Sequence, residues 1–183
     1  NNTESLQKCY NEFIEHARSN SIDIALLIHD DVHINCSDLY NRLVHSAESF
    51  NVFGVAGAVS CKIGNPALWH LMSEKQDQRG CVAHGSREQY AYSSFGPLPS
   101  RSLLIDGVLI GININSLPTK VKFDESYPSK FHYYDLDFSL ECNRNSVKIG
   151  VVDIPIIHQS PGLTNPNEEF FKGQDYFIKK WKQ

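Results

Sequence analysis

The sequence predicts an α/β fold in which a mostly parallel sheet is flanked by helices. With 183 residues the chain has the length of one ordinary domain, which is enough to bury a substantial core. The first sixty residues alternate between helical and strand patterns, which is typical of right-handed βαβ layouts. Two short, nearly continuous apolar runs, 22–28 and 52–59, are typical of strands buried on both faces of a parallel sheet.

Apolar side chains at three-and-four spacing predict the helices. Thr3 is expected to cap a first helix, whose inward side chains would be Leu6, Tyr10, Phe13 and Ala17. Ser37 is expected to cap a second helix, whose inward side chains would be Leu39, Leu43, Ala47 and Phe50. A short helix is expected around 134–143 and a C-terminal helix over 167–183, all within the single domain 1–183.

Strands are also predicted at 102–107, 108–114 and 147–152. Between 60 and 100 the periodicity fails, and so long an irregular segment inside a compact domain is typical of a lid or binding loop. Trp69 in this segment would either stack on the ring of a ligand or pack on the core.

Composition excludes several classes of protein. Lys and Arg number 17 against 21 Asp and Glu, a net charge of −4, so no basic excess exists to bind nucleic acid. No apolar run approaches the ~20 residues of a membrane-spanning helix. The five cysteines include no C-x-x-C pair, which predicts free thiols and a cytoplasmic location.

Acidic residues stand where the first strand ends, in the run His29-Asp30-Asp31-Val32-His33. Ligands of open α/β sheets gather beyond the carboxyl ends of strands. Because side chains alternate along a strand, His29, Asp31 and His33 would share one face. Such a set suits Mn²⁺ or Zn²⁺, or with waters and phosphate oxygens Mg²⁺ or Mn²⁺. A solvated turn is the alternative.

Three further places carry candidate polar groups. Asp135 and Asp137 point about 200° apart on the third predicted helix, so we expect one to face a cleft and the other to be solvated. Asp106-Gly107 lies at another strand end, and His158 follows the last predicted strand.

The order of these motifs resembles the family 2 glycosyltransferases of GT-A fold, in their bacterial branch with a His-Asp-Asp metal motif. The sequence elements that carry the resemblance are His29-Asp30-Asp31, Gly54-Val55-Ala56-Gly57, Ile105-Asp106-Gly107-Val108, Phe123-Asp124-Glu125, Tyr134-Asp135-Leu136-Asp137 and His158.

The resemblance implies roles for individual residues. Asp31 would bind a divalent metal, Mn²⁺ or Mg²⁺, that bridges the diphosphate of a nucleotide-sugar donor, and His158 would complete the metal site. Asp30 would face the donor ribose or support the metal, and Asp106-Gly107 would line the cleft. Asp135 would be the catalytic base, with Tyr134 where the family has Glu, and His29 stands where the family has its first Asp.

In the family a strand–helix–strand unit that holds the nucleotide base precedes the first helix found here. Either the parent chain carries it upstream or the donor pocket is incomplete, and an unpaired sheet edge would invite pairing with another copy. Lys179, Lys180 and Lys182 would form a solvated helix face or touch an anionic membrane surface, where lipid-linked acceptors lie.

The first hypothesis is therefore an inverting, metal-dependent glycosyltransferase that moves a sugar to a glycan or lipid-linked acceptor. A non-catalytic GT-A-like binding domain is the second. A metal-dependent hydrolase built around His29, Asp31, His33 and His158 is the third.

Overall fold

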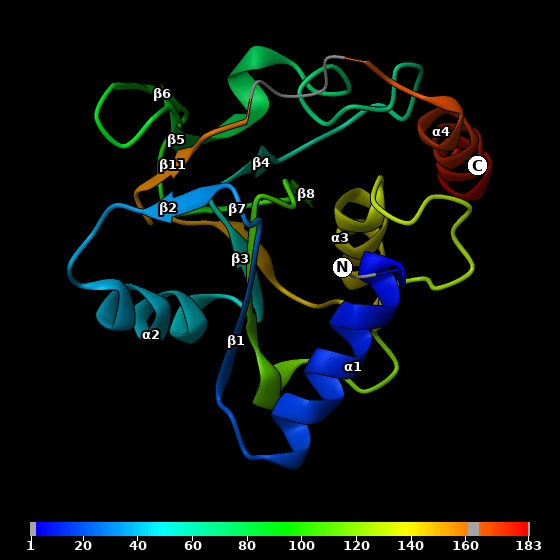
Figure 1. The fold of residues 1–183 in the computed structure, drawn as a ribbon. Coiled ribbons are helices and arrows are strands. Elements are labelled where there is room, and N and C mark those ends of the chain that lie inside the picture. Colours follow the sequence, from blue (N-terminus) through cyan, green and yellow to red (C-terminus); the bar gives the residue numbers. More distant parts are fainter. Residues whose placement is uncertain (1–2, 161–164, 183) are drawn as a thin grey trace.

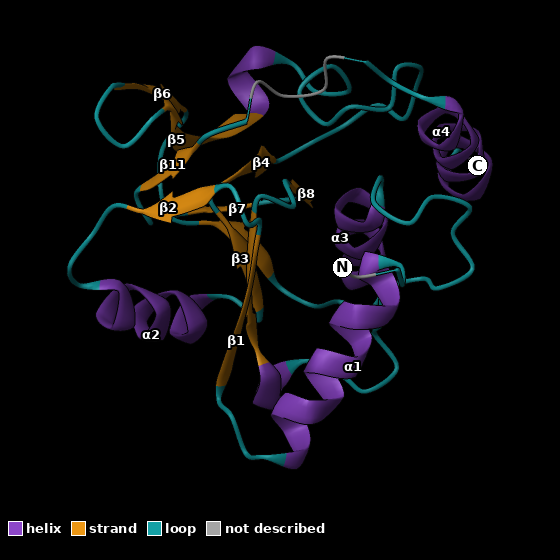
Figure 2. Ribbon diagram, viewed as in Figure 1, coloured by secondary structure: helices purple, strands orange, loops and turns teal. Residues whose placement is uncertain are grey.

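A computed structural model describes residues 3–160 and 165–182. Its helices are α1 (Leu6–Ser19), α2 (Leu39–Ser49), α3 (Tyr134–Arg144) and α4 (Glu168–Trp181). Its strands are β1 (Ile24–Ile28), β2 (Val32–Ile34), β3 (Val52–Gly54), β4 (Ala56–Ala58), β5 (Gln78–Gly85), β6 (Tyr90–Phe95), β7 (Ser100–Arg101), β8 (Leu104–Ile105), β9 (Leu109–Asn113), β10 (Ile149–Val151) and β11 (Ile156–His158). Figures 1 and 2 show their arrangement.

The strands form two mixed sheets. One has the order β1-β9-β3-β10-β7, and the other the order β2-β11-β5-β4-β8 with β6 paired to β5. Among the described strands only β10–β3 and β11–β5 pair in parallel. The fold is therefore α/β, but the expectation of a mostly parallel sheet is wrong. An apolar run shows that a strand is buried, not which way its neighbour runs, and β1 pairs antiparallel with β9 along its whole length.

The run 52–59 is not one strand. It divides at Val55 into β3 and β4, which belong to different sheets. Gly57 allows β4 to lie close to β8, since a Cβ at this position would come within 2.0 Å of the Leu104 carbonyl oxygen. Because β3 and β4 follow each other directly in the chain, Val55 connects the two sheets at the centre of the molecule (Figure 2).

Two apolar clusters pack on the two faces of the five-stranded sheet. On one face, Ile14 and Ala17 of α1 pack with Phe138 and Cys142 of α3. On the other, the apolar side of α2 and the second sheet enclose a cluster around Phe53. Helix α4 packs outside α3 through a third cluster (Figure 1).

The four predicted helices are present, with different caps. Ser5, not Thr3, caps α1 by accepting the Lys8 amide, and Asp38 rather than Ser37 precedes α2. Phe13 is 40% exposed rather than inward.

The segment 60–100 is less irregular than predicted, because β5 and β6 form a hairpin within it. The exposed face of β6 carries Tyr90 and Tyr92, so its burial pattern differs from that of a core strand.

Candidate active site

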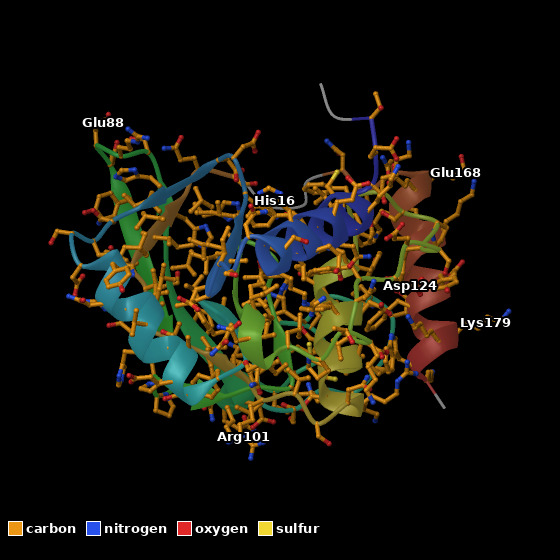
Figure 3. The ribbon with its side chains drawn as sticks, turned by 90° about the horizontal axis from the view of Figure 1, so that it is seen from below. His16, Glu88, Arg101, Asp124, Glu168 and Lys179 are labelled. Carbon is orange, nitrogen blue, oxygen red and sulfur yellow. The ribbon has the colours of Figure 1, made fainter. Side chains whose placement is uncertain are left out.

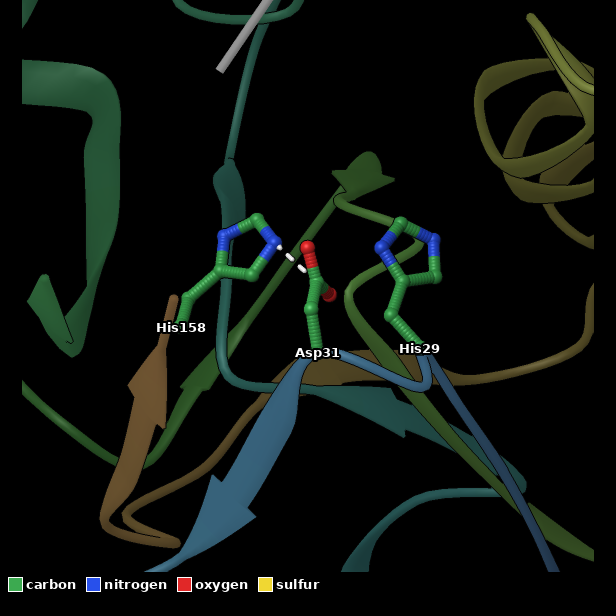
Figure 4. A group of neighbouring side chains, drawn as sticks. All are labelled: His29, Asp31 and His158. Carbon is green, nitrogen blue, oxygen red and sulfur yellow. Dashed lines mark ion pairs between the residues drawn. The ribbon is translucent and has the colours of Figure 1, made fainter. Parts of the chain in front are cut away.

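A tight turn after β1 brings together the first group of candidate residues. The amide of Val32 donates to the His29 carbonyl at 3.3 Å, so the chain reverses between β1 and β2. His158 ends β11 and lies opposite Val32 in the antiparallel β2–β11 pair. Asp31 therefore reaches His158 although 127 positions separate them in the chain, and their Oδ1 and Nε2 atoms are 3.3 Å apart (Figure 4).

His29 completes this group, with one potential ligand atom from each of the three side chains lying within 4.8 Å of the others. Asp31 Oδ1 and His158 Nε2 are buried and form no hydrogen bond with any described residue, although they lie 3.3 Å from each other. Buried polar atoms without hydrogen bonds are costly, and a cation would satisfy both. Burial lowers the pKa of His29, which favours the neutral imidazole that a metal needs. The three side chains fit a divalent cation.

His33 does not belong to this group. In the register of the second sheet, His158 pairs with Val32 and His84, whereas His33 pairs with Ile157. Because paired residues share a face and neighbours alternate, His33 points to the opposite side of the sheet from His158. The expectation that His29, Asp31 and His33 share one face is wrong, because the turn at 29–31 interrupts the alternation.

Asp135 lies in the first turn of α3 and is held by two backbone amides. Its Oδ2 accepts the Gly107 N–H at 2.8 Å, and its Oδ1 accepts the Leu136 N–H at 2.9 Å. Burial and then the charge of Asp106 raise the pKa of Asp135 to about 7, against the opposing effect of these amides. A carboxyl group with this pKa is suited to accept a proton near neutral pH.

Asp106 lies beside it at the end of β8. Its Oδ1 accepts the Val108 N–H at 2.9 Å, and its Oδ2 accepts the Trp69 indole N–H at 2.7 Å. Trp69 packs against two of the apolar clusters, as one of the two expectations had it, and its indole N–H also fixes the side chain of Asp106.

All these groups open into one cavity of about 530 Å³. It is lined by residues of the second sheet, of the loops that follow β1 and β8, of α3 and of α4. Those with candidate roles are His29, Asp31, Trp69, Asp106, Gly107, Tyr134, Asp135 and His158. The structure thus brings together all the residues to which the resemblance assigns a role except Asp30, which is exposed and, like His33, is not part of this lining.

Asp137 is not solvated, contrary to the expectation for the second acid of this helix. It is 1% exposed, and it accepts hydrogen bonds from Lys180 at 3.0 Å and from the Trp181 indole at 2.7 Å. Lys180 also binds Asp124, which Figure 3 shows beside α4. Lys180 therefore anchors α4 to α3 and does not belong to a free lysine face, while Lys179 and Lys182 are exposed.

The family model described as "Glycosyltransferase like family" matches residues 1–180. The chain belongs to this glycosyltransferase-like family. Membership indicates a transferase that uses a sugar donor and an acceptor. No curated protein matches the chain with significance. Within the described ranges, none of the helices has the length and apolar character needed to cross a bilayer.

Sequence reasoning missed two features of this cavity. The Tyr134 hydroxyl reaches His29 and Gly107, and Phe170 of α4 forms part of the cavity wall. The only signal for Tyr134 was its departure from the Glu of the family pattern. Nothing in the periodicity of α4 indicates that Phe170 faces a cavity.

Proposed function

We propose that this domain transfers a sugar from a nucleoside-diphosphate-sugar donor to a hydroxyl group of a glycan or a lipid-linked acceptor, with inversion and with a divalent cation. One observation supports this most strongly: three possible cation ligands and a carboxyl group with a near-neutral pKa line the same cavity. Sugar transfer needs both, one for the leaving group and one for the nucleophile.

Asp31, His29 and His158 would hold the cation, which would neutralise charge on the departing diphosphate. Two imidazoles and one carboxylate favour Mn²⁺ over Mg²⁺, because Mg²⁺ prefers oxygen ligands.

Asp135 acts as the base. As the acceptor oxygen bonds to the anomeric carbon, the bond from that carbon to the diphosphate oxygen breaks, and the acceptor proton passes to Asp135. A single displacement of this kind inverts the anomeric centre and needs no second carboxylate as nucleophile. The Gly107 amide orients Asp135, and Asp106 keeps a negative charge nearby that raises its proton affinity.

Calorimetry with Mn²⁺ and either UDP or GDP tests the donor site. We expect nucleotide binding that requires Mn²⁺, lost in Asp31→Ala and retained in Asp175→Ala, a matched change at an exposed position of α4. Binding of Mn²⁺ without either nucleotide would contradict the proposal and favour a hydrolase. Binding of neither would favour a non-catalytic domain.

The base is tested separately by incubating the protein with Mn²⁺ and a panel of UDP- and GDP-sugars and measuring the nucleoside diphosphate that is released, with water as acceptor. Asp135→Asn is expected to retain nucleotide binding and to lose at least about 100-fold in turnover, the range typical of a general base. Unchanged turnover would remove Asp135 from this role.

A further inference from the structure

The first two residues of α3 hold both polar groups of the Gly107 backbone. Asp135 accepts the Gly107 N–H at 2.8 Å, and the Tyr134 hydroxyl donates to the Gly107 carbonyl at 3.2 Å. Only glycine permits this approach, since a Cβ at position 107 would lie 2.2 Å from the Tyr134 hydroxyl oxygen. The turn between β8 and β9 and the start of α3 are therefore fixed to each other.

The same hydroxyl lies 2.7 Å from Nε2 of His29. The Tyr134 hydroxyl also hydrogen-bonds with that of Tyr10, which has a hydrogen of its own to donate to it. A phenol has one hydrogen to donate, and the buried Gly107 carbonyl, unlike the Tyr10 hydroxyl, can only accept, so it requires the hydrogen of Tyr134. The oxygen of Tyr134 is then an acceptor toward His29, so Nε2 of His29 carries the proton. The lone pair of this imidazole is left on Nδ1.

Figure 4 shows the ring of His29 with its other nitrogen turned toward the Asp31 carboxylate. The direction of the hydrogen bonds and the orientation of the ring thus agree. One places a lone pair on Nδ1, and the other aims that atom at the group formed with Asp31 and His158.

We propose that Tyr134 is a positioning residue that fixes His29 as the Nε2–H tautomer, so that Nδ1 faces Asp31 and His158 as a ligand for a divalent cation. The chain of hydrogen bonds runs from His29 through Tyr134 to Gly107, whose amide holds Asp135. It ties the cation site to the helix that carries the proposed base. Only the cation in this proposal rests on the proposed function, because the tautomer is a property of the protein alone.

Long-range ¹H–¹⁵N correlation spectra of the histidine-labelled protein at pH 8, without metal, test the tautomer directly. The His29 signals are assigned by their loss in His29→Gln. We expect Nε2–H in the wild type and a mixture of tautomers in Tyr134→Phe. An Nδ1–H tautomer in the wild type would overturn the proposal.

The second measurement is Mn²⁺ affinity, followed by electron paramagnetic resonance. Tyr134→Phe is expected to weaken Mn²⁺ binding about 10-fold or more, as loss of a partner of a metal-bound histidine does. Tyr127→Phe is the matched control, since its buried hydroxyl makes no hydrogen bond with a described residue, and it should leave affinity unchanged. Equal affinity in Tyr134→Phe and wild type would overturn the role of Tyr134.

The two measurements also separate this proposal from the proposed function. If the wild type binds no Mn²⁺, the proposed cation site fails, yet the tautomer spectra still decide whether Tyr134 sets the state of His29. If Mn²⁺ binds and the spectra show Nδ1–H, the proposed function stands and the role of Tyr134 falls.

Discussion

Replacing Asp135 by Asn should stabilise the folded protein relative to the wild type, and this gain in the free energy of unfolding should be larger at alkaline pH than at acid pH. The reason is the environment of the carboxyl group, in which burial and the nearby Asp106 raise the pKa to about 7 from an ordinary 3.8. Between these two values the folded protein keeps the proton and the unfolded chain does not. Stability therefore falls as pH rises through this window, and the decline ends above pH 7.

The size of the effect follows from the same two values. Each unit of pKa difference corresponds to about 1.4 kcal/mol, so a shift of roughly three units costs the folded wild type about 4 kcal/mol once the pH exceeds 7. At pH 4.5 most of this cost is absent. Asn cannot ionise, so the advantage of Asp135→Asn should increase by about 3 kcal/mol between pH 4.5 and pH 8.

Urea unfolding of both proteins at pH 4.5 and pH 8 measures this difference. Any hydrogen bond that Asn fails to make contributes equally at the two pH values and cancels in the comparison. Asp175→Asn, at an exposed position of α4, provides the control and should show no such change. A difference between mutant and wild type that is the same at both pH values would refute the assignment of a raised pKa to Asp135.

Two further substitutions test the supports of the site by urea unfolding. The side chain of Asp137 is buried, with only 2% of it exposed. Lys180→Met removes the cation that pairs with this carboxylate and should lower the free energy of unfolding by about 3 kcal/mol. The same change at the exposed Lys179 should cost under about 0.5 kcal/mol, and equal losses would show that the buried pair contributes nothing. Gly57→Ala places a Cβ 2.0 Å from a backbone carbonyl oxygen and should lower the free energy of unfolding by at least about 2 kcal/mol. Gly64→Ala is the control and should lower it far less, because the nearest neighbour of its Cβ lies at 3.6 Å. Similar losses of stability in the two variants would refute the close approach of β4 and β8.

The helices could be predicted from the sequence because their information is local. A stripe of apolar residues over three turns specifies a helix and the face it buries, and α1, α2 and α4 follow that pattern, whereas α3 is buried on several sides. Strand direction is not local. The run 22–28 is apolar whether its neighbour is parallel or antiparallel, and the antiparallel partner, β9, lies over 80 residues further along the chain.

The hairpin of β5 and β6 escaped prediction for a related reason. Its second strand is exposed along most of its length, so the alternation of apolar and polar residues that marks a half-buried strand is absent. The pairing is specified instead by the turn at 86–89, where the Ser86 amide donates to the Gln89 carbonyl. Sequence patterns that measure burial do not register such a strand.

Within the site, the sequence indicated the chemical types and the resemblance indicated which of them would meet. Asp31 and His158 are far apart in the chain, and no spacing rule connects them. The antiparallel register of β2 and β11 brings them together, and that same register turns His33 away. The position of Asp137 was misjudged because the Lys180 that accompanies it belongs to α4, an element with no visible link to α3 in sequence.

The resemblance drawn from the sequence implied Glu where this chain has Tyr134, and the surroundings give a physical reason for the tyrosine. A carboxylate here could accept the His29 N–H, but it has no hydrogen to donate to the Gly107 carbonyl. It would also add a negative charge in a buried place beside Asp106 and Asp135, where Asp135 already has a raised pKa. Burial instead raises the pKa of the Tyr134 hydroxyl well above its ordinary value, so the group stays neutral and can accept and donate at once. With histidine at position 29, a neutral hydroxyl at 134 therefore satisfies both neighbours, so the two residues that differ from the pattern implied by the resemblance are consistent with each other.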